Sequence, residues 1–178
     1  MSTILKEWQK GRYRGGRPVL KTPVLPVDWL LEALAVAGLL FLAGYALYHY
    51  GKLPDTIPSH FNAAGEADDF SGKGSFWFLP GVALFVYVLL TFISRIPHRF
   101  NYLVEITPKN AAVQYRLAVR MLRVLKLVLM VVFILIIHGI IRSTTDPSSG
   151  LGLWFMPVFL GLVFIPMIVY FVLAAKNR

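Results

Sequence analysis

Four long apolar stretches dominate this sequence. They run over residues 29–48, 75–94, 127–141 and 151–175. A helix of about 20 apolar residues crosses the ~30 Å hydrocarbon core of a bilayer, and a helical segment before the shorter third stretch can supply its missing turns. A soluble chain of 178 residues has no use for four such stretches. We therefore predict an all-α integral membrane protein, a four-transmembrane-helix bundle whose function lies in its polar segments.

The composition narrows the function classes. Apolar residues make up 57% of the chain and charged residues only 15%, against about 25% charged residues in a typical soluble domain. The chain has no cysteine, which excludes disulfides and thiolate chemistry. The net charge of +9 could suggest nucleic acid, but the basic tail has few aromatic residues among its cations. We expect no nucleic-acid partner and a lipid bilayer as the main one.

The basic residues are distributed unevenly between the two sides of the predicted bundle. Fifteen of the 18 Lys and Arg residues fall in the N-terminal tail, between the second and third stretches, or at the C-terminus. Five of the nine acids fall in the other two connections. Because Lys and Arg near span ends stay on the cytoplasmic side, both termini are expected in the cytoplasm.

The predicted organisation is a basic cytoplasmic tail, residues 1–27, followed by one membrane domain, residues 28–178. Spans are expected at about 28–50, 75–95, 120–141 and 151–175, with an outer loop over 51–74 and an inner amphipathic segment over 107–126. Asp28 is the expected N-cap of the first span. Thr107 is the expected N-cap of a helix that begins at Pro108 and continues as helix three.

The inner segment carries a basic stripe. Arg116, Arg120 and Arg123 follow one another at helical spacing, so one face of this extension of helix three is cationic and is expected to bind lipid phosphate. A solvated face and a docking surface for a cytoplasmic protein stay open as alternatives. Glu32 lies near the inner interface, in the first turn of the first span. We interpret it first as an anion that the helix dipole favours there, and second as a proton or ion site.

The outer loop is the most specific polar segment. Pro54 and Pro58 favour extended backbone before them. Ile57 and residues 60–62 are therefore expected to pair with residues 69–71 through a turn over residues 64–66, in which Gly65 takes a positive φ. Such a hairpin would gather His60, Asn62, Asp68 or Asp69, and Lys73.

Three interpretations of this cluster stay open. The polar groups could simply hydrogen-bond the loop, they could bind an external ligand, or they could hold a divalent metal, with His60, Asp68 and His138 as candidate ligands. The spacing matches no metal-ligand pattern, and we find no phosphate loop, nucleophile elbow or metalloprotease motif. No catalytic residue is therefore predicted, and no cofactor is expected beyond that metal.

The residues Leu53-Pro54, Ile57-Pro58-Ser59-His60-Phe61-Asn62 and Gly65 to Asp68, followed by Lys73, resemble the signature of a bacterial membrane family of unknown function. The same domain forms the N-terminal part of SdpI-type immunity proteins, which protect a cell from its own secreted toxin and signal by tethering a repressor. The resemblance implies a bacterial cytoplasmic (inner) membrane and a ligand site. Its signature positions are Pro58, His60, Asn62, Gly65, Asp68 and Lys73. No second module is visible after the fourth span, so the immunity and signalling role is an implication only.

Three functions follow from these observations. The first is a non-enzymatic membrane protein whose outer loop binds an envelope or peptide ligand. The second is a metal-dependent membrane enzyme or metal-binding protein that uses the outer His and Asp cluster. The third is a transporter, which would have to form a homo-oligomer to build a pathway from four short spans.

Overall fold

The computed structural model describes residues 13–14, 16–146 and 149–178. Its elements are β1 (Tyr13–Arg14), β2 (Arg17–Pro18), α2 (Pro26–Tyr50), β3 (Thr56–Phe61), β4 (Ala67–Gly72), η1 (Lys73–Trp77), α3 (Phe78–Ile93), η2 (Pro97–Arg99), α4 (Ala111–Thr145) and α5 (Phe155–Lys176). Four helical segments are long and apolar enough to cross a membrane: Pro26–Tyr50, Lys73–Ile93, Ala111–Thr145 and Phe155–Lys176. The predicted class, an all-α four-helix membrane bundle, is confirmed.

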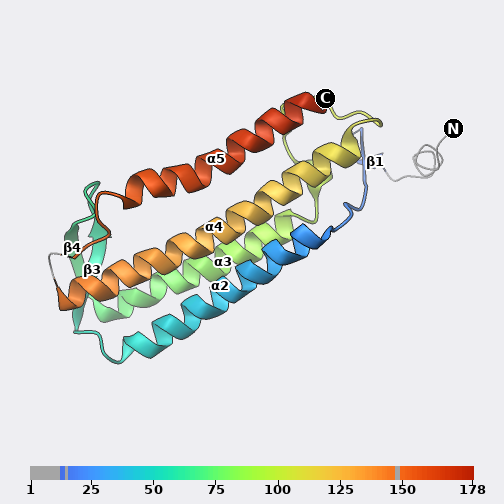
Figure 1. Cartoon of the computed structure of the whole chain (residues 1–178). Helices are drawn as coiled ribbons and strands as arrows, with labels where there is room; N and C mark the ends of the chain where they lie inside the picture. Colours follow the sequence, from blue (N-terminus) through green and yellow to red (C-terminus); the bar gives the residue numbers. More distant parts are fainter. Residues whose placement is uncertain (1–12, 15, 147–148) are drawn as a thin grey trace.

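The helices α2, α3 and α4 lie side by side, and α5 packs on α4 from the other side (Figure 1). The hairpin β3–β4 lies at one end of the bundle, and the C-terminus and the β1–β2 segment lie at the opposite end. The core between α2, α3, α4 and the hairpin is apolar. Its buried members include Leu42, Ile57, Phe76, Met130 and Ile137.

Most large apolar side chains on the outside of the helices are exposed. Leu40, Phe85 and Ile165 are examples, each more than 60% accessible. Such a surface would be a liability in water, and it is what a bilayer requires of helices whose backbone groups are satisfied internally. The chain is therefore a multi-pass membrane protein.

Two helix starts differ from the sequence prediction. Asp28 is not the N-cap of the first span, because α2 already begins at Pro26, where proline is accepted in the first turn. The Asp28 carboxylate instead accepts the N–H of Leu25 at 2.9 Å from inside that turn. Similarly, α4 begins at Ala111 and not at Pro108.

The segment before α4 explains the second difference. Thr107 and Asn110 bond each other's backbone N–H groups, at 2.9 Å and 3.4 Å, and the Asn110 amide also donates to the carbonyl of Glu105. The Ala111 N–H also bonds the Thr107 carbonyl at 3.0 Å, so these bonds form a turn that leads directly into α4, with Thr107 in the capping contact that the sequence predicts. The prediction that helix three is one long element is confirmed, since α4 has 35 residues, about 52 Å at 1.5 Å per residue.

The inner end of the bundle (the end that bears the termini) is closed by several segments. Gln114 is fully buried and donates to the carbonyls of Ala174 and Asn177 at 2.9 and 3.0 Å. The Tyr115 hydroxyl, also buried, donates to the carbonyl of Pro18 at 3.0 Å. Burial raises the pKa of Tyr102, which keeps its hydroxyl protonated as a donor to the Pro97 carbonyl at 3.0 Å. The described part of the predicted tail is thus docked on the helices.

Candidate functional site

The hairpin in residues 51–74 forms as predicted, with β3 and β4 paired antiparallel; we call its end of the bundle, opposite the termini, the outer end. Asn62 shapes its turn: the side-chain oxygen accepts the N–H groups of Ala64 at 2.9 Å and Glu66 at 3.1 Å. Gly65 has φ +79°, a conformation that costs a residue with a Cβ. The turn is therefore specified locally by an asparagine and a glycine at fixed positions.

This turn docks on the loop before α5. The Gly65 carbonyl accepts the N–H of Leu151 at 2.7 Å. A Cβ on Gly150 would overlap the Gly65 carbonyl, and a Cβ on Gly65 would overlap the backbone of Gly152. Backbone approaches backbone here without side chains between them, so the hairpin is rigidly attached to the start of α5.

The six signature residues have different surroundings. Pro58 is buried, and Asn62 and Gly65 form the turn. The Lys73 ammonium donates to the Leu53 carbonyl at 3.4 Å and lies 5.1 Å from the ring centre of Tyr50. All four of these residues thus stabilise the hairpin or its attachment.

His60 and Asp68 are different, because they form a pair that points into solvent. The His60 Nδ1 lies 2.6 Å from Asp68 Oδ1, and the two side chains are 66% and 44% exposed. Beside them the Ser59 hydroxyl donates to Asp69 Oδ2 at 3.2 Å. Such an exposed pair adds little to stability. Its position on a rigid support makes it available to a ligand.

The third metal candidate does not join this pair. His138 Nδ1 bonds the Tyr45 hydroxyl at 2.9 Å. Among the described residues, no three His, Asp or Glu side chains come together in a group that could hold a metal. The pair His60–Asp68 could supply two ligands, and any further ligand would have to come from solvent or from a bound molecule.

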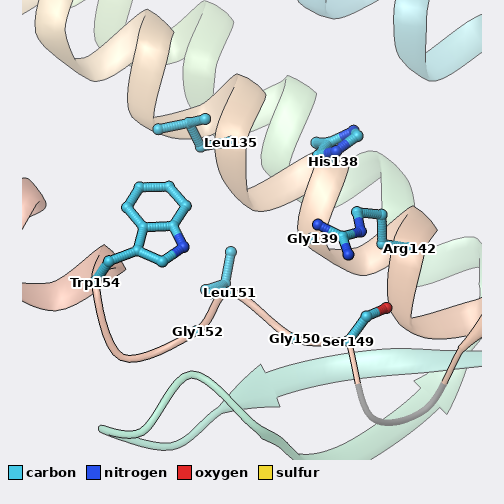
Figure 2. Close-up of a pocket in the computed structure, with 9 residues that line it drawn as sticks. All are labelled: Leu135, His138, Gly139, Arg142, Ser149, Gly150, Leu151, Gly152 and Trp154. Carbon is cyan, nitrogen blue, oxygen red and sulfur yellow. The ribbon is translucent and has the colours of Figure 1, made fainter.

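A cavity of about 260 Å³ opens between the end of α4 and the loop before α5 (Figure 2). It is lined by Leu135, His138, Gly139, Arg142, Ser149, Gly150, Leu151, Gly152 and Trp154. Arg142 is the one cation that is charged at every pH in this lining, and no acid lines it. The cavity therefore combines a guanidinium, an indole and apolar walls.

A second polar feature lies toward the inner end, where α2, α3 and α4 meet. Asp28 is fully buried and accepts two hydrogen bonds from Arg120, at 2.9 and 3.2 Å. Arg123 lies 3.3 Å from Asp28 and donates to Glu32 at 3.2 Å. Lys126, 1% exposed, donates to Glu32 at 2.5 Å and to the Thr91 hydroxyl at 2.9 Å, the latter on α3. We call Asp28, Glu32, Arg120, Arg123 and Lys126 the inner ionic cluster.

The sequence analysis found this cluster only in part. The helical spacing placed Arg116, Arg120 and Arg123 on one face, which was predicted to bind lipid phosphate. The structure gives two of these guanidinium groups carboxylate partners on α2. Lipid binding by this stripe stays a prediction. Lys126 was missed, although a lysine and a glutamate inside apolar stretches are a signal of mutual pairing.

Comparison with known proteins finds a similarity that includes the hairpin. Residues 37–84 match a family described as "Domain of unknown function (DUF1648)". An uncharacterized protein of Archaeoglobus fulgidus is 36% identical over 66 residues, which cover 37% of this chain and 34% of that protein. No solved structure matches. The part of this chain that resembles the domain of unknown function is therefore the second half of α2, the hairpin and the first turns of α3.

Proposed function

We propose that this protein is a non-enzymatic membrane receptor whose outer hairpin binds an extended, basic peptide from the cell envelope. The observation that carries the proposal is the second edge of strand β4, the edge that faces away from β3. Within the described chain β4 pairs with β3 in a two-stranded sheet, so no strand is paired with its second edge. An open strand edge accepts another extended chain by backbone hydrogen bonding.

The charge on this strand favours a basic partner. Glu66, Asp68 and Asp69 are all exposed along the turn and β4. Phe70 on the same strand is 56% exposed and offers an apolar contact between the acids and the membrane end of the hairpin. Three exposed acids next to one exposed aromatic side chain suit a peptide that carries both basic and apolar side chains.

Recognition suits this surface better than catalysis does. The His60–Asp68 pair is open to water, whereas catalytic groups gain most of their electrostatic effect in sites that exclude water. The resemblance of the motif to SdpI-type immunity proteins supports a peptide ligand and a role in protection or signalling. The distribution of Lys and Arg supports a cytoplasmic membrane with the hairpin outside and both termini inside.

A binding measurement with defined peptides tests the proposal. The protein in lipid nanodiscs is titrated with a synthetic decapeptide that alternates lysine and valine, with the same peptide carrying glutamate in place of lysine, and with a lysine peptide interrupted by proline. We expect the lysine peptide to bind, the glutamate peptide not to bind, and the proline peptide to bind weakly because proline removes backbone donors.

Variants identify the surface used. The double variant Asp68→Asn, Asp69→Asn should lower the affinity roughly tenfold, about 1.4 kcal/mol, and high salt should do the same. Asp55→Asn is the matched control, since Asp55 is exposed and precedes β3. If all three peptides bound alike, or if the double variant bound as the wild type does, the hairpin would not be a peptide-binding edge.

A further inference from the structure

The contact between α4 and α5 contains two hollows that lie one after the other. The first is the cavity of Figure 2, at the outer end. The second, about 470 Å³, has only apolar lining residues: Val124, Val128, Val158, Gly161, Leu162, Ile165 and Pro166. The lining residues of α4 share one face of that helix, because their positions, 128, 135, 139 and 142, follow helical spacing. The same holds for the lining residues of α5 and the residue before it, at positions 154, 158, 161 and 165. Both hollows therefore lie along one seam between the two helices.

Two residues of α5, Gly161 and Pro166, help to leave the seam open. Gly161 has no side chain, and an added Cβ would have its nearest contact at 3.7 Å, the Ile165 Cδ1. Pro166 interrupts the hydrogen bonding of α5. An apolar hollow of this size offers water no polar partners, and its walls lose dispersion contacts if it stays empty. In a bilayer the available filler is an acyl chain.

The outer end of the seam carries a charge that suits an anion. Figure 2 shows the Arg142 guanidinium and the Trp154 indole facing the same hollow, from the last turns of α4 and from the residue before α5. No acidic residue is among the described residues that line this hollow. A planar guanidinium binds a phosphate through two parallel hydrogen bonds, and an indole N–H donates one more.

We infer that the α4–α5 seam is a specific site for a phospholipid with an anionic headgroup, its phosphate on Arg142 and one acyl chain along the apolar hollow. The dimensions agree with this occupant. From Trp154 to Pro166 the helix rises roughly 18 Å, slightly more than half of the ~30 Å hydrocarbon core. This site shares no residue with the edge of β4, and it differs from the predicted arginine stripe at the other end of α4.

Native mass spectrometry of the full chain tests the inference. The delipidated protein is exposed to equimolar phosphatidylglycerol and phosphatidylcholine in detergent, and the retained lipid is identified. We expect one phosphatidylglycerol to be retained in preference. Arg142→Gln should lower its retention roughly tenfold, the effect of losing about one charge-assisted hydrogen bond. Lys52→Gln is the control, because Lys52 is an exposed cation that lies over Tyr48 and away from the seam.

A second variant tests the acyl-chain part. Gly161→Leu places a side chain in the apolar hollow, which has room for it, and should lower retention of phosphatidylglycerol while the unfolding temperature stays close to that of the wild type. Equal retention of the two lipids, or wild-type retention by Arg142→Gln, would overturn the inference. Binding of soluble glycerophosphate as strong as that of the lipid would overturn it too, because the site would then hold a free anion.

Discussion

The inner ionic cluster gives the sharpest stability prediction, at Asp28. This carboxylate has no exposed surface and accepts hydrogen bonds from the Leu25 N–H and from two nitrogens of Arg120. The variant Asp28→Asn keeps the shape of the side chain and removes its charge. Arg120 would then lose the acidic partner that it has in the cluster, whereas Arg123 would keep Glu32.

The expected loss of unfolding free energy follows from the burial and the contacts of this ion pair. Breaking a buried ion pair by removing one partner costs about 3–5 kcal/mol. The Arg120 side chain is 31% exposed, so it can recover part of its hydration, and the asparagine oxygen can still accept the Leu25 N–H. We therefore expect a loss of about 2–3 kcal/mol in the free energy of unfolding.

The assay is reversible unfolding in mixed micelles of mild detergent and dodecyl sulfate, followed by tryptophan fluorescence. Asp55→Asn, the same substitution at an exposed site, should change the free energy by less than about 0.5 kcal/mol. In a double-mutant cycle, Arg120→Gln should cost less in the Asp28→Asn background than in the wild type, by about 1–3 kcal/mol. If Asp28→Asn unfolded like Asp55→Asn, or if the cycle showed no coupling, the buried pair would not stabilise the bundle.

Four further outcomes are expected. Gly65→Ala should destabilise the protein by about 3 kcal/mol, because a positive φ and a backbone overlap add, whereas Gly72→Ala, where an added Cβ meets nothing within 4 Å, should not; equal unfolding curves would contradict this. Tyr115→Phe leaves the Pro18 carbonyl without its buried donor, so trypsin should cleave the N-terminal segment faster, and an unchanged rate would refute the docking. Removing divalent metals with a chelator should leave the unfolding temperature unchanged, since no group of three ligands forms in the described chain; a drop of several degrees would show a missed metal. In the cysteine-free chain, Ser59→Cys should react with a membrane-impermeant maleimide on intact cells, and labelling only after lysis would reverse the predicted orientation.

The sequence predicts the hairpin well because its determinants are local. Prolines fix φ, an asparagine side chain closes the turn over its own backbone, and one glycine supplies the positive φ. All of these act within 12 residues and do not depend on the rest of the fold. The docking of Gly65 on Gly150 and Leu151 could not be predicted, since it joins segments more than 80 residues apart through backbone atoms alone.

The helix starts and the inner ionic cluster show the opposite case. A capping residue indicates that a helix begins nearby, and both Asp28 and Thr107 were correct within a few residues. Asp28 lies inside the first turn of α2, where it accepts the Leu25 N–H, and Thr107 accepts the Asn110 N–H just before α4. The spacing of Arg120 and Arg123 showed that they share a face. Which element that face meets depends on how α4 is rotated against α2, a property of the whole packing.

The contacts also distinguish α5 from the other three helices, because α5 packs on α4 whereas α2, α3 and α4 all pack on one another. The inner ionic cluster and the apolar core join α2, α3 and α4. In contrast, α5 packs mainly on α4, and its buried residues are Tyr170 and Ala174. The same α5 is attached at its start to the hairpin turn, through the bond from Leu151 to the Gly65 carbonyl. A ligand that shifts the turn must therefore either break that bond or move the loop before α5. Because the α4–α5 seam is lined by that same helix, occupation of the hairpin and occupation of the seam would be coupled through α5, and by reciprocity each would change the affinity of the other.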